Sequence, residues 1–513
     1  MDETKKLPKP ALVALLVALG ASVPYLHPAL ARLRLVSAAD VSRTLGAFRG
    51  VPRVPLLRRN EIPPPLPSQE ATGAPPPAAH VESRAVAEGP RGPVPASPGT
   101  PIEDPAGDLS RFFAALDRVE KGESGALARI SHYGDSPLTG DMISGEARSM
   151  LQKQFGNGGP GFVLAGRPWG WYGHRGIALD AKGWTPHSPL LTWGNGGHYG
   201  LGLVSFSSAS AGARSDVAWE KGRFTRAEVT FTVAPGNGTL LVSVDGGAEE
   251  AVPTAGAERR TARFVAAAPE GAARIALRPK GDGEVTVYGV TLETAGPGLV
   301  YDALGANGSS VHALALADAK GWIDSLALRG SDLVILNYGT NESGNEAIAG
   351  PHYVRELVGL VGRVRTALPE ASVLIMAPMD RGARGPEGEI TTMPAIPKIV
   401  EAQRKAAQEA RCAFFDTYAA MGGDGTMARW YRSEPRLVTG DFTHTTFAGS
   451  ERVARLLVDA LLGARAARGG PPPAAGAPAG TDAPTAPAAP APTAPAGDAG
   501  SSLPASAAER PPG

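Results

Sequence analysis

The chain has 513 residues, and its 50 basic residues are balanced by 50 acidic ones. This length allows two or three domains with buried cores, and a chain without a basic excess is a poor candidate for binding nucleic acid. Cys412 is the only cysteine, which excludes an intramolecular disulfide and a cysteine-rich zinc site.

The first 31 residues read as a targeting segment. Lysines at positions 5, 6 and 9 precede a nearly continuous apolar stretch from Ala11 to Val23, the order of a signal peptide. Ala29-Leu30-Ala31 offers a small-x-small cleavage site. An uncleaved membrane anchor is the alternative, with the lysines on the cytoplasmic side. Both interpretations place the rest of the chain outside the cytoplasm.

Two segments are predicted to be disordered. Residues 32–105 form a linker that is rich in Pro, Ala and Gly from about Pro52, and residues 466–513 form an Ala/Pro-rich tail. Such segments lack the apolar content that would offset the entropy lost on ordering. The folded part of the chain is therefore expected between residues 106 and 465.

Strands and helices alternate through most of this folded part. A strand at 127–133, with polar Ser131 and His132 within it, leads into Gly134-Asp135-Ser136, and a helix follows over 140–155. Apolar runs of strand length and apolar stripes at helical spacing then recur in order. These are a strand at 333–336, a helix around 354–364, a strand at 373–377, a helix at 399–411, a strand at 412–415 and a helix at 447–462. The alternation predicts a parallel sheet with helices on both faces.

A different pattern occupies the middle of the chain. Residues 224–233, 240–244, 274–277 and 284–292 alternate apolar with polar or small residues between Gly-rich turns. This pattern predicts antiparallel strands in a sandwich or jelly roll. An insert of this kind is tolerated when its ends lie close together.

Three side chains suited to acyl transfer lie at the two ends of the folded part. Ser136 follows a tight turn, and Asp441 and His444 stand three residues apart some three hundred residues later. Nucleophile, base and orienting carboxylate form such a series in serine hydrolases. Each half has an ordinary alternative, since Ser136 before Pro137 is also a good helix cap and the Asp–His pair also suits a solvated loop.

Two further motifs lie between these ends. Asn341 comes just after the predicted buried strand at 333–336, where open α/β sheets bind their ligands. Gly308 lies in a loop of small residues before a helical pattern. The Gly308 N–H and the Asn341 side-chain amide are both able to donate to an oxyanion, and a plain turn is the alternative interpretation of each motif.

These four motifs, in this order, resemble the SGNH or GDSL hydrolases. The resemblance implies a three-layer, flavodoxin-like α/β fold. It also implies that Ser136 is the nucleophile, His444 the general base and Asp441 the residue that orients it, with Ser136, Gly308 and Asn341 forming the oxyanion hole. Gly305 is the competing choice for the glycine. Pro137-Leu138 departs from members that have leucine directly after the serine. No cofactor or metal is expected.

About 170 residues separate Ser136 from Gly308, far more than is usual in the family. The predicted organisation is therefore a hydrolase domain in two parts, 106–160 and 297–465, interrupted by a β-sandwich at 161–296. This layout resembles peptidoglycan and polysaccharide O-acetylesterases that carry a carbohydrate-binding insert. Five of the seven tryptophans fall in the insert, and Trp169, Trp171 and Tyr172 are candidate sugar contacts, with core packing as the alternative for any one tryptophan.

The resemblance implies a carboxylic ester hydrolase, an acetylesterase that removes O-acetyl groups from an extracytoplasmic glycan such as peptidoglycan. The same triad would also serve an O-acetyltransferase, and a glycan-binding envelope protein with an idle triad is the third alternative. Acetylated polysaccharide is the expected partner, and the site of action is periplasmic, in the cell envelope or secreted. His132 and His312 are interpreted as structural hydrogen bonders rather than second bases.

Overall fold

The computed structural model describes residues 99–190 and 197–469. The predicted signal peptide or anchor, most of the linker and most of the Ala/Pro-rich tail lie outside these residues, so these assignments remain predictions. Within the described residues, no helix is both long and apolar enough to cross a membrane.

A parallel sheet organises the part of the fold that carries the predicted motifs. Its strands, in spatial order, are β13 (Gly298–Gly305), β1 (Leu127–Gly134), β14 (Leu333–Asn337), β15 (Ser372–Met376) and β18 (Ala413–Phe415). Numbered along the chain, these strands have the order 2-1-3-4-5, which is the flavodoxin-like order. From β1 the chain goes to β13 on one side, and the later strands β14, β15 and β18 are added on the other side. The boundary between β1 and β14 is therefore the switch point at which such sheets bind ligands.

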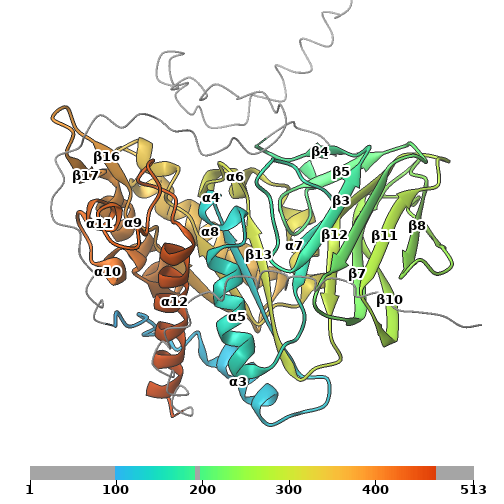
Figure 1. Ribbon diagram of the computed structural model, residues 1–513, viewed down its shortest axis with the longest axis horizontal. Coiled ribbons are helices and arrows are strands. Elements are labelled where there is room, and N and C mark those ends of the chain that lie inside the picture. The colour runs from blue at the N-terminus through green and yellow to red at the C-terminus, as the bar shows by residue number, and fades with distance from the viewer. Residues whose placement is uncertain (1–98, 191–196, 470–513) are drawn as a thin grey trace, which may run out of the picture. The chain divides into compact units, whose positions relative to one another are not determined.

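Helices cover both faces of this sheet (Figure 1). One layer contains α3 (Ser110–Glu120), α5 (Ile143–Phe155), α10 (Thr417–Met421), α11 (Thr426–Tyr431) and α12 (Phe447–Ala467). The other contains α6 (Val311–Leu316), α7 (Ala319–Arg329), α8 (Pro351–Ala367) and α9 (Ala395–Ala410). Successive residues of β14 pack into opposite layers, since Leu333 and Ile335 belong to the first core and Val334 and Leu336 to the second. The three-layer α/β prediction is confirmed.

Antiparallel strands form two sheets between β1 and β13 in the chain. One sheet has the order β10 (Arg260–Ala272), β7 (Phe224–Val233), β12 (Val285–Glu293), β5 (Ser205–Ser208) and β4 (Thr185–His187), with β2 (Gly161–Leu164) also paired to β12. The other has the order β3 (Ile177–Lys182), β6 (Arg214–Trp219), β11 (Arg274–Pro279), β8 (Thr239–Val244) and β9 (Glu250–Pro253). Both lie beside the parallel sheet (Figure 1). A short hairpin of β16 (Gly382–Arg384) and β17 (Ile390–Thr392) completes the strands described.

The structure differs from the predictions at two boundaries and in one strand. Ile102 is buried and Glu103 forms a two-way backbone bridge with Phe414, so the folded chain begins inside the predicted linker. Helix α12 continues to Ala467, two residues into the predicted tail. Strand β13 was not anticipated because Asp302 interrupts its apolar run, although Asp302 is fully buried and paired with Arg329.

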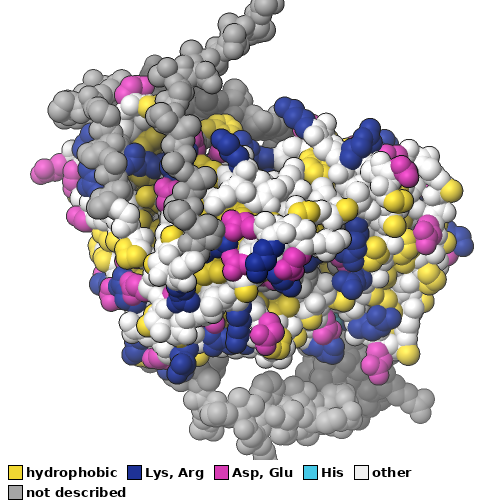
Figure 2. Space-filling view, turned by 90° about the horizontal axis from the view of Figure 1, so that it is seen from below, with side chains coloured by type: hydrophobic (Ala, Val, Ile, Leu, Met, Phe, Trp, Pro, Cys, Tyr) yellow, Lys and Arg dark blue, Asp and Glu magenta, His cyan; other side chains and the backbone are white. Residues whose placement is uncertain are grey.

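The charges on the surface are mixed as well as balanced. On the face shown in Figure 2, basic and acidic side chains are interspersed rather than gathered into patches of one sign. Exposed pairs of opposite charge also occur, such as Arg455 with Glu451, 3.0 Å apart and one turn apart on α12. Such exposed pairs contribute little to stability.

A buried ion-pair cluster joins the sandwich to the parallel sheet. Arg329, the last residue of α7, donates to Asp302 on β13 at 2.6 and 3.1 Å and to Glu293 at the end of β12 at 2.7 Å. Arg129 on β1 also donates to Glu293, at 2.8 and 2.9 Å. The side chains of Arg329, Asp302 and Glu293 are almost fully buried. The cluster therefore fixes the exit from the sandwich against the sheet.

Removing Arg329 should destabilise the protein strongly. In the variant Arg329→Ala, two buried carboxylates lose their main cation, and breaking a buried pair from one side costs about 3–5 kcal/mol. Urea unfolding measures the loss. The control Arg278→Ala removes an exposed pair with Glu249 on the sandwich and should leave the free energy of unfolding nearly unchanged. Equal losses in the two variants would contradict the importance assigned to the buried cluster.

Candidate active site

The turn after β1 presents Ser136 at the carboxyl edge of the sheet. Asp135 occupies the N-cap position of the short helix α4 (Ser136–Thr139), so Ser136 is the first helical residue. A Cβ added to Gly305, at the end of β13, would lie 2.6 Å from the backbone of Leu138 and Thr139. The neighbouring strand approaches α4 so closely that only glycine fits at this position, which fixes where the serine stands.

The Asp441–His444 loop is a compact turn before α12. Asp441 Oδ1 accepts hydrogen bonds from the backbone N–H groups of Thr443 and His444, each at 3.0 Å, and from Thr439 Oγ1 at 2.7 Å. The N–H of Thr439 donates to the His444 carbonyl at 2.8 Å. Thr446 then caps α12 by accepting from the Gly449 N–H. Asp and Thr side chains thus satisfy the backbone of a loop that carries the imidazole.

The structure brings the three predicted residues of the triad into one hydrogen-bonded series. Ser136 Oγ lies 2.8 Å from His444 Nε2, and His444 Nδ1 lies 2.6 Å from Asp441 Oδ2. This geometry requires the tautomer in which Nδ1–H donates to the carboxylate and Nε2 accepts the serine proton. Burial alone would raise the pKa of Asp441, but its hydrogen bonds with His444 and Thr439 outweigh this and hold that pKa below its usual value. Asp441 is therefore ionised at neutral pH.

The predicted oxyanion donors lie at the same edge of the sheet. Gly308 is exposed, with φ +74°, in the loop between β13 and α6. Neither its N–H nor that of Ser136 has an acceptor among the residues that the structure describes. Asn341 precedes the short 3₁₀ helix Glu342–Gly344, and its Nδ2 donates to the Ser309 carbonyl at 2.7 Å. An amide has a second hydrogen, so Asn341 holds the loop and retains a donor.

Glu342 is a buried residue of this region that the sequence analysis did not identify. Its carboxylate accepts from the Val311 N–H at 2.9 Å and from the Gly339 N–H at 3.1 Å. It therefore ties the start of α6 to the turn after β14, and so positions both loops that carry the predicted donors. Burial raises the pKa of this carboxyl. One indication of this role is present in the sequence, which is that Glu342 directly follows Asn341. It was not used because a glutamate in a loop is ordinarily solvated.

Asp135 lies beneath the serine and is also buried. Its Oδ2 accepts from the Thr340 N–H at 3.2 Å, which links the turn of β1 to that of β14. Burial, and then the negative charge of Glu342, raise the pKa of Asp135 to about 7. Asp135 thus supports the turn, the role that a local hydrogen bonder has in such a motif.

A cavity of about 650 Å³ opens beside Ser136 and His444. Trp171 and Phe447 line it and remain 61% and 72% exposed, so both rings present apolar faces to a ligand. Asn307 and Arg175 add polar groups to the lining. Phe447, Asn307 and Arg175 are absent from the predicted contacts, although Phe447 follows His444 by only three residues.

The three predicted aromatic contacts fall in different environments. Trp171 lines the cavity. Tyr172 is buried and its hydroxyl accepts from the Leu164 N–H at 2.8 Å, so it is a core residue. Trp169 is half-buried and packs against the same core. Neither Trp169 nor Tyr172 is among the cavity-lining residues.

A buried polar cluster supports the floor of the cavity. Asp141 accepts from Arg148 at 2.6 and 3.1 Å, from Ser144 at 2.7 Å and from the Arg175 N–H at 2.8 Å. Burial acts to raise the pKa of Asp141, but Arg148 lowers it to about 2. Burial, reinforced by Arg148, lowers the pKa of His174 to about 4. His174 is thus neutral at pH 7, and the segment that carries Trp171 is anchored to α5.

His132 and His312 were predicted to be structural hydrogen bonders rather than second bases. His132 on β1 is buried, with Nδ1 2.7 Å from the Tyr301 hydroxyl, and burial lowers its pKa to about 3. His312 is exposed on α6, with Nδ1 2.7 Å from Glu356. Both side chains are hydrogen-bonded, and neither lines the cavity beside Ser136.

Comparison with known proteins identifies the class. Residues 266–452 match the model of the GDSL-like Lipase/Acylhydrolase family. The matched range includes Gly308, Asn341, Asp441 and His444 and starts within β10, so Ser136 lies before it. The protein is a carboxylic ester hydrolase with a GDSL-like acylhydrolase domain, and the predicted resemblance is confirmed.

Solved structures similar to this fold were also found. A peptidoglycan O-acetylesterase is 24% identical with a TM-score of 0.60, covering 70% of this chain and 97% of its own. At this identity the likeness shows the fold. Family two carbohydrate esterases from Cellvibrio japonicus (12% identity, TM-score 0.21, 58% of this chain and 95% of that one) and Clostridium thermocellum (13%, 0.23, 52% and 95%) also match, but too weakly to support an argument. No curated protein matched the sequence.

Asp135 should make stability fall as the pH rises. The folded protein keeps this carboxyl protonated up to about pH 7, whereas the unfolded chain releases the proton near pH 4. The folded state therefore binds more protons in this window, and stability decreases through it. Asp135→Asn removes the titration, so its free energy of unfolding relative to wild type should rise between pH 4 and 7.5, by at most about 4 kcal/mol.

Urea unfolding at several pH values measures this difference. Asp424→Asn, an exposed carboxyl on the α10–α11 loop, is the control and should give a nearly constant offset from wild type. A constant offset for Asp135→Asn over the same range would show that Asp135 ionises normally in the folded protein.

Proposed function

We propose that this protein is a serine esterase that removes O-acetyl groups from a glycan outside the cytoplasm, with peptidoglycan as the leading candidate. Ser136 attacks the ester carbonyl while His444 takes its proton, and Asp441 orients the imidazole and stabilises the imidazolium. The bond between the acyl carbon and the sugar oxygen breaks, and the sugar oxygen leaves with the proton held by His444. Water then hydrolyses the acyl-enzyme to acetate and free Ser136. The unbroken series Ser136–His444–Asp441, with spacings of 2.8 and 2.6 Å, is the observation that carries this proposal.

The oxyanion is assigned to the N–H groups of Ser136 and Gly308 and the side chain of Asn341. The two backbone donors have no competing acceptor in the described part of the chain, and Asn341 is held by Ser309. Preorganised donors of this kind stabilise the developing charge because they need not reorient during the reaction. Asn307, which lines the cavity, is a further amide within the same loop.

Three observations support an acetylated glycan as substrate. Trp171 and Phe447 beside Ser136 offer exposed aromatic faces of the kind that stack on sugar rings. The likeness in fold to a peptidoglycan O-acetylesterase points to the same substrate class. The N-terminal segment has the basic and apolar pattern of a signal peptide or membrane anchor, which supports a site of action outside the cytoplasm. Under this proposal residues 161–296 form an inserted glycan-binding sandwich within a hydrolase domain of residues 106–160 and 297–465.

Substitution of the triad should abolish ester hydrolysis without unfolding the protein. Ser136→Ala should lower kcat for an aryl acetate by about 10⁴- to 10⁶-fold, and Asp441→Asn by about 10⁴-fold because the imidazole then adopts the wrong tautomer. The control Ser110→Ala, an exposed serine on α3, should retain full activity. Wild-type turnover by Ser136→Ala would refute the assigned nucleophile.

Trp171 should matter for glycans and not for small esters. Trp171→Ala should raise KM for acetylated peptidoglycan several-fold, while kcat/KM for an aryl acetate changes little, because a small ester does not reach the ring. Leu316→Ala, an exposed apolar residue outside the cavity lining, is the matched control. An equal loss on both substrates would mean that Trp171 shapes the catalytic geometry instead. Free acetate, measured against acetylated acceptor, separates hydrolysis from transfer in the same assay.

A further inference from the structure

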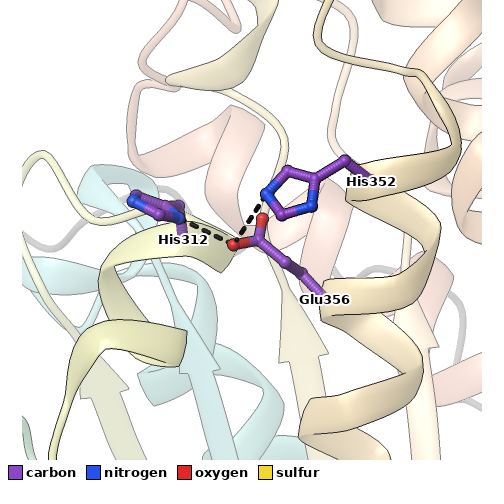
Figure 3. Close-up of side chains that lie close together, drawn as sticks. All are labelled: His312, His352 and Glu356. Atoms are coloured by element: carbon purple, nitrogen blue, oxygen red, sulfur yellow. Dashed lines mark hydrogen bonds and ion pairs between the residues drawn. The ribbon is translucent and has the colours of Figure 1, made fainter. Parts of the chain in front are cut away.

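Three side chains of types that can ligate a metal ion lie close together where helices α6 and α8 meet. His312 comes from α6, and His352 and Glu356 come from α8 (Figure 3). His312 Nδ1 lies 2.7 Å and His352 Nε2 lies 3.4 Å from the same carboxylate oxygen of Glu356. One ligand atom from each residue lies within 4.8 Å of the other two. The triad and its cavity use none of these residues.

The packing of the two helices sets this geometry. Pro351 is the first residue of α8, and His352 and Glu356 are four residues apart, which places them on one face of the helix. Ser310 caps α6 by accepting from the Ala313 N–H at 3.1 Å, so His312 is in the first turn. Val311 and Leu314 on α6 and Leu357 and Leu360 on α8 belong to one buried core. The cluster therefore bridges two fixed helices.

We propose that His312, His352 and Glu356 bind a divalent transition metal of the zinc type. Two imidazole nitrogens and one carboxylate oxygen form a donor set that zinc prefers, whereas magnesium and calcium favour oxygen donors. Tetrahedral ligands about 2.1 Å from zinc lie about 3.4 Å from one another, close to the His352–Glu356 separation. The fourth position faces solvent and takes water.

The ligands need only small movements to enclose an ion. His312 must move back from Glu356 by less than 1 Å, and its side chain is 60% exposed and that of His352 72% exposed, so both are free to turn. The Glu356 side chain is only 15% exposed and so provides a fixed point. Two imidazolium ions this close would repel each other, whereas one dication is attracted to all three groups. This arrangement suits a shared cation better than two separate ion pairs.

A metal here would cross-link the helix that follows the Gly308 loop to α8. Glu342 already accepts from the Val311 N–H, and Asn341 from the other side holds the Ser309 carbonyl. A bound ion would add a third tie on the outer face of α6, next to residues 306–310. The chemistry of the ester is left to the triad, so the ion acts on stability and on the rigidity of this loop.

Zinc titration of the purified full-length chain, carrying a tag without histidine, tests the proposal. Calorimetry should give one tight equivalent of zinc, and zinc should raise Tm because it binds only the folded state. Magnesium at the same concentration should do neither. His352→Gln and Glu356→Gln should each weaken zinc binding by at least about tenfold, which is the cost of losing even a supporting contact to a ligand, and should remove the shift in Tm.

Two controls separate this site from others in the chain. His187→Gln replaces a half-buried histidine on β4, and Glu409→Gln replaces an acidic residue of α9 that pairs with Lys405; both should bind zinc like wild type. Unchanged zinc affinity in His352→Gln and Glu356→Gln would overturn the proposal, as would a wild-type chain that binds no zinc. Since binding is measured without substrate, the result is independent of the proposed esterase activity.

Discussion

The hydrogen bond between Ser136 and His444 joins residues 308 positions apart in the chain, and every other feature of the site depends on this closure. It forms because β1 and the loop before α12 meet at one edge of the parallel sheet. The close approach of Gly305 to the backbone of α4 fixes the serine, and the hydrogen bonds of Asp441 fix the imidazole. Each half is thus held in place by contacts within the protein, which is the preorganisation that the proposed mechanism needs.

Buried carboxylates connect the loops around this closure. Asp135 bonds to the turn after β14, and Glu342 bonds both to that turn and to the start of α6. Burial raises the pKa of both carboxyls. The pKa of Asp135 rises to about 7, so Asp135 is partly protonated at neutral pH. Burying these two carboxyls lowers the stability of the fold. In return, their hydrogen bonds fix where the backbone of three strands ends. Strained or costly polar groups are usually found at functional sites for this reason.

Local patterns were sufficient to predict the scaffold and the residues that converge on it. The apolar run before Asn341 and the helical stripe of α8 appear in the sequence as they do in the fold. Strand β13 was not predicted because a charged residue, Asp302, interrupts its apolar run. The partner that allows Asp302 to be buried is Arg329, which lies 27 residues away in the sequence. Glu342 and Phe447 were not predicted as site residues for a similar reason. Their burial or exposure follows from packing between segments, and no single segment of sequence contains that information.

The same argument explains why spacing did not reveal the cluster on α6 and α8. His352 and Glu356 have the helical spacing of a metal site, but a third ligand is needed, and His312 belongs to another helix 40 residues earlier. The pair becomes significant only when the core residues of α6 and α8 bring the helices together. The insertion that separates Ser136 from Gly308 leaves this pairing intact, since both helices follow β13. A surface site can therefore be added to this scaffold without changing the edge of the sheet where the ester would react.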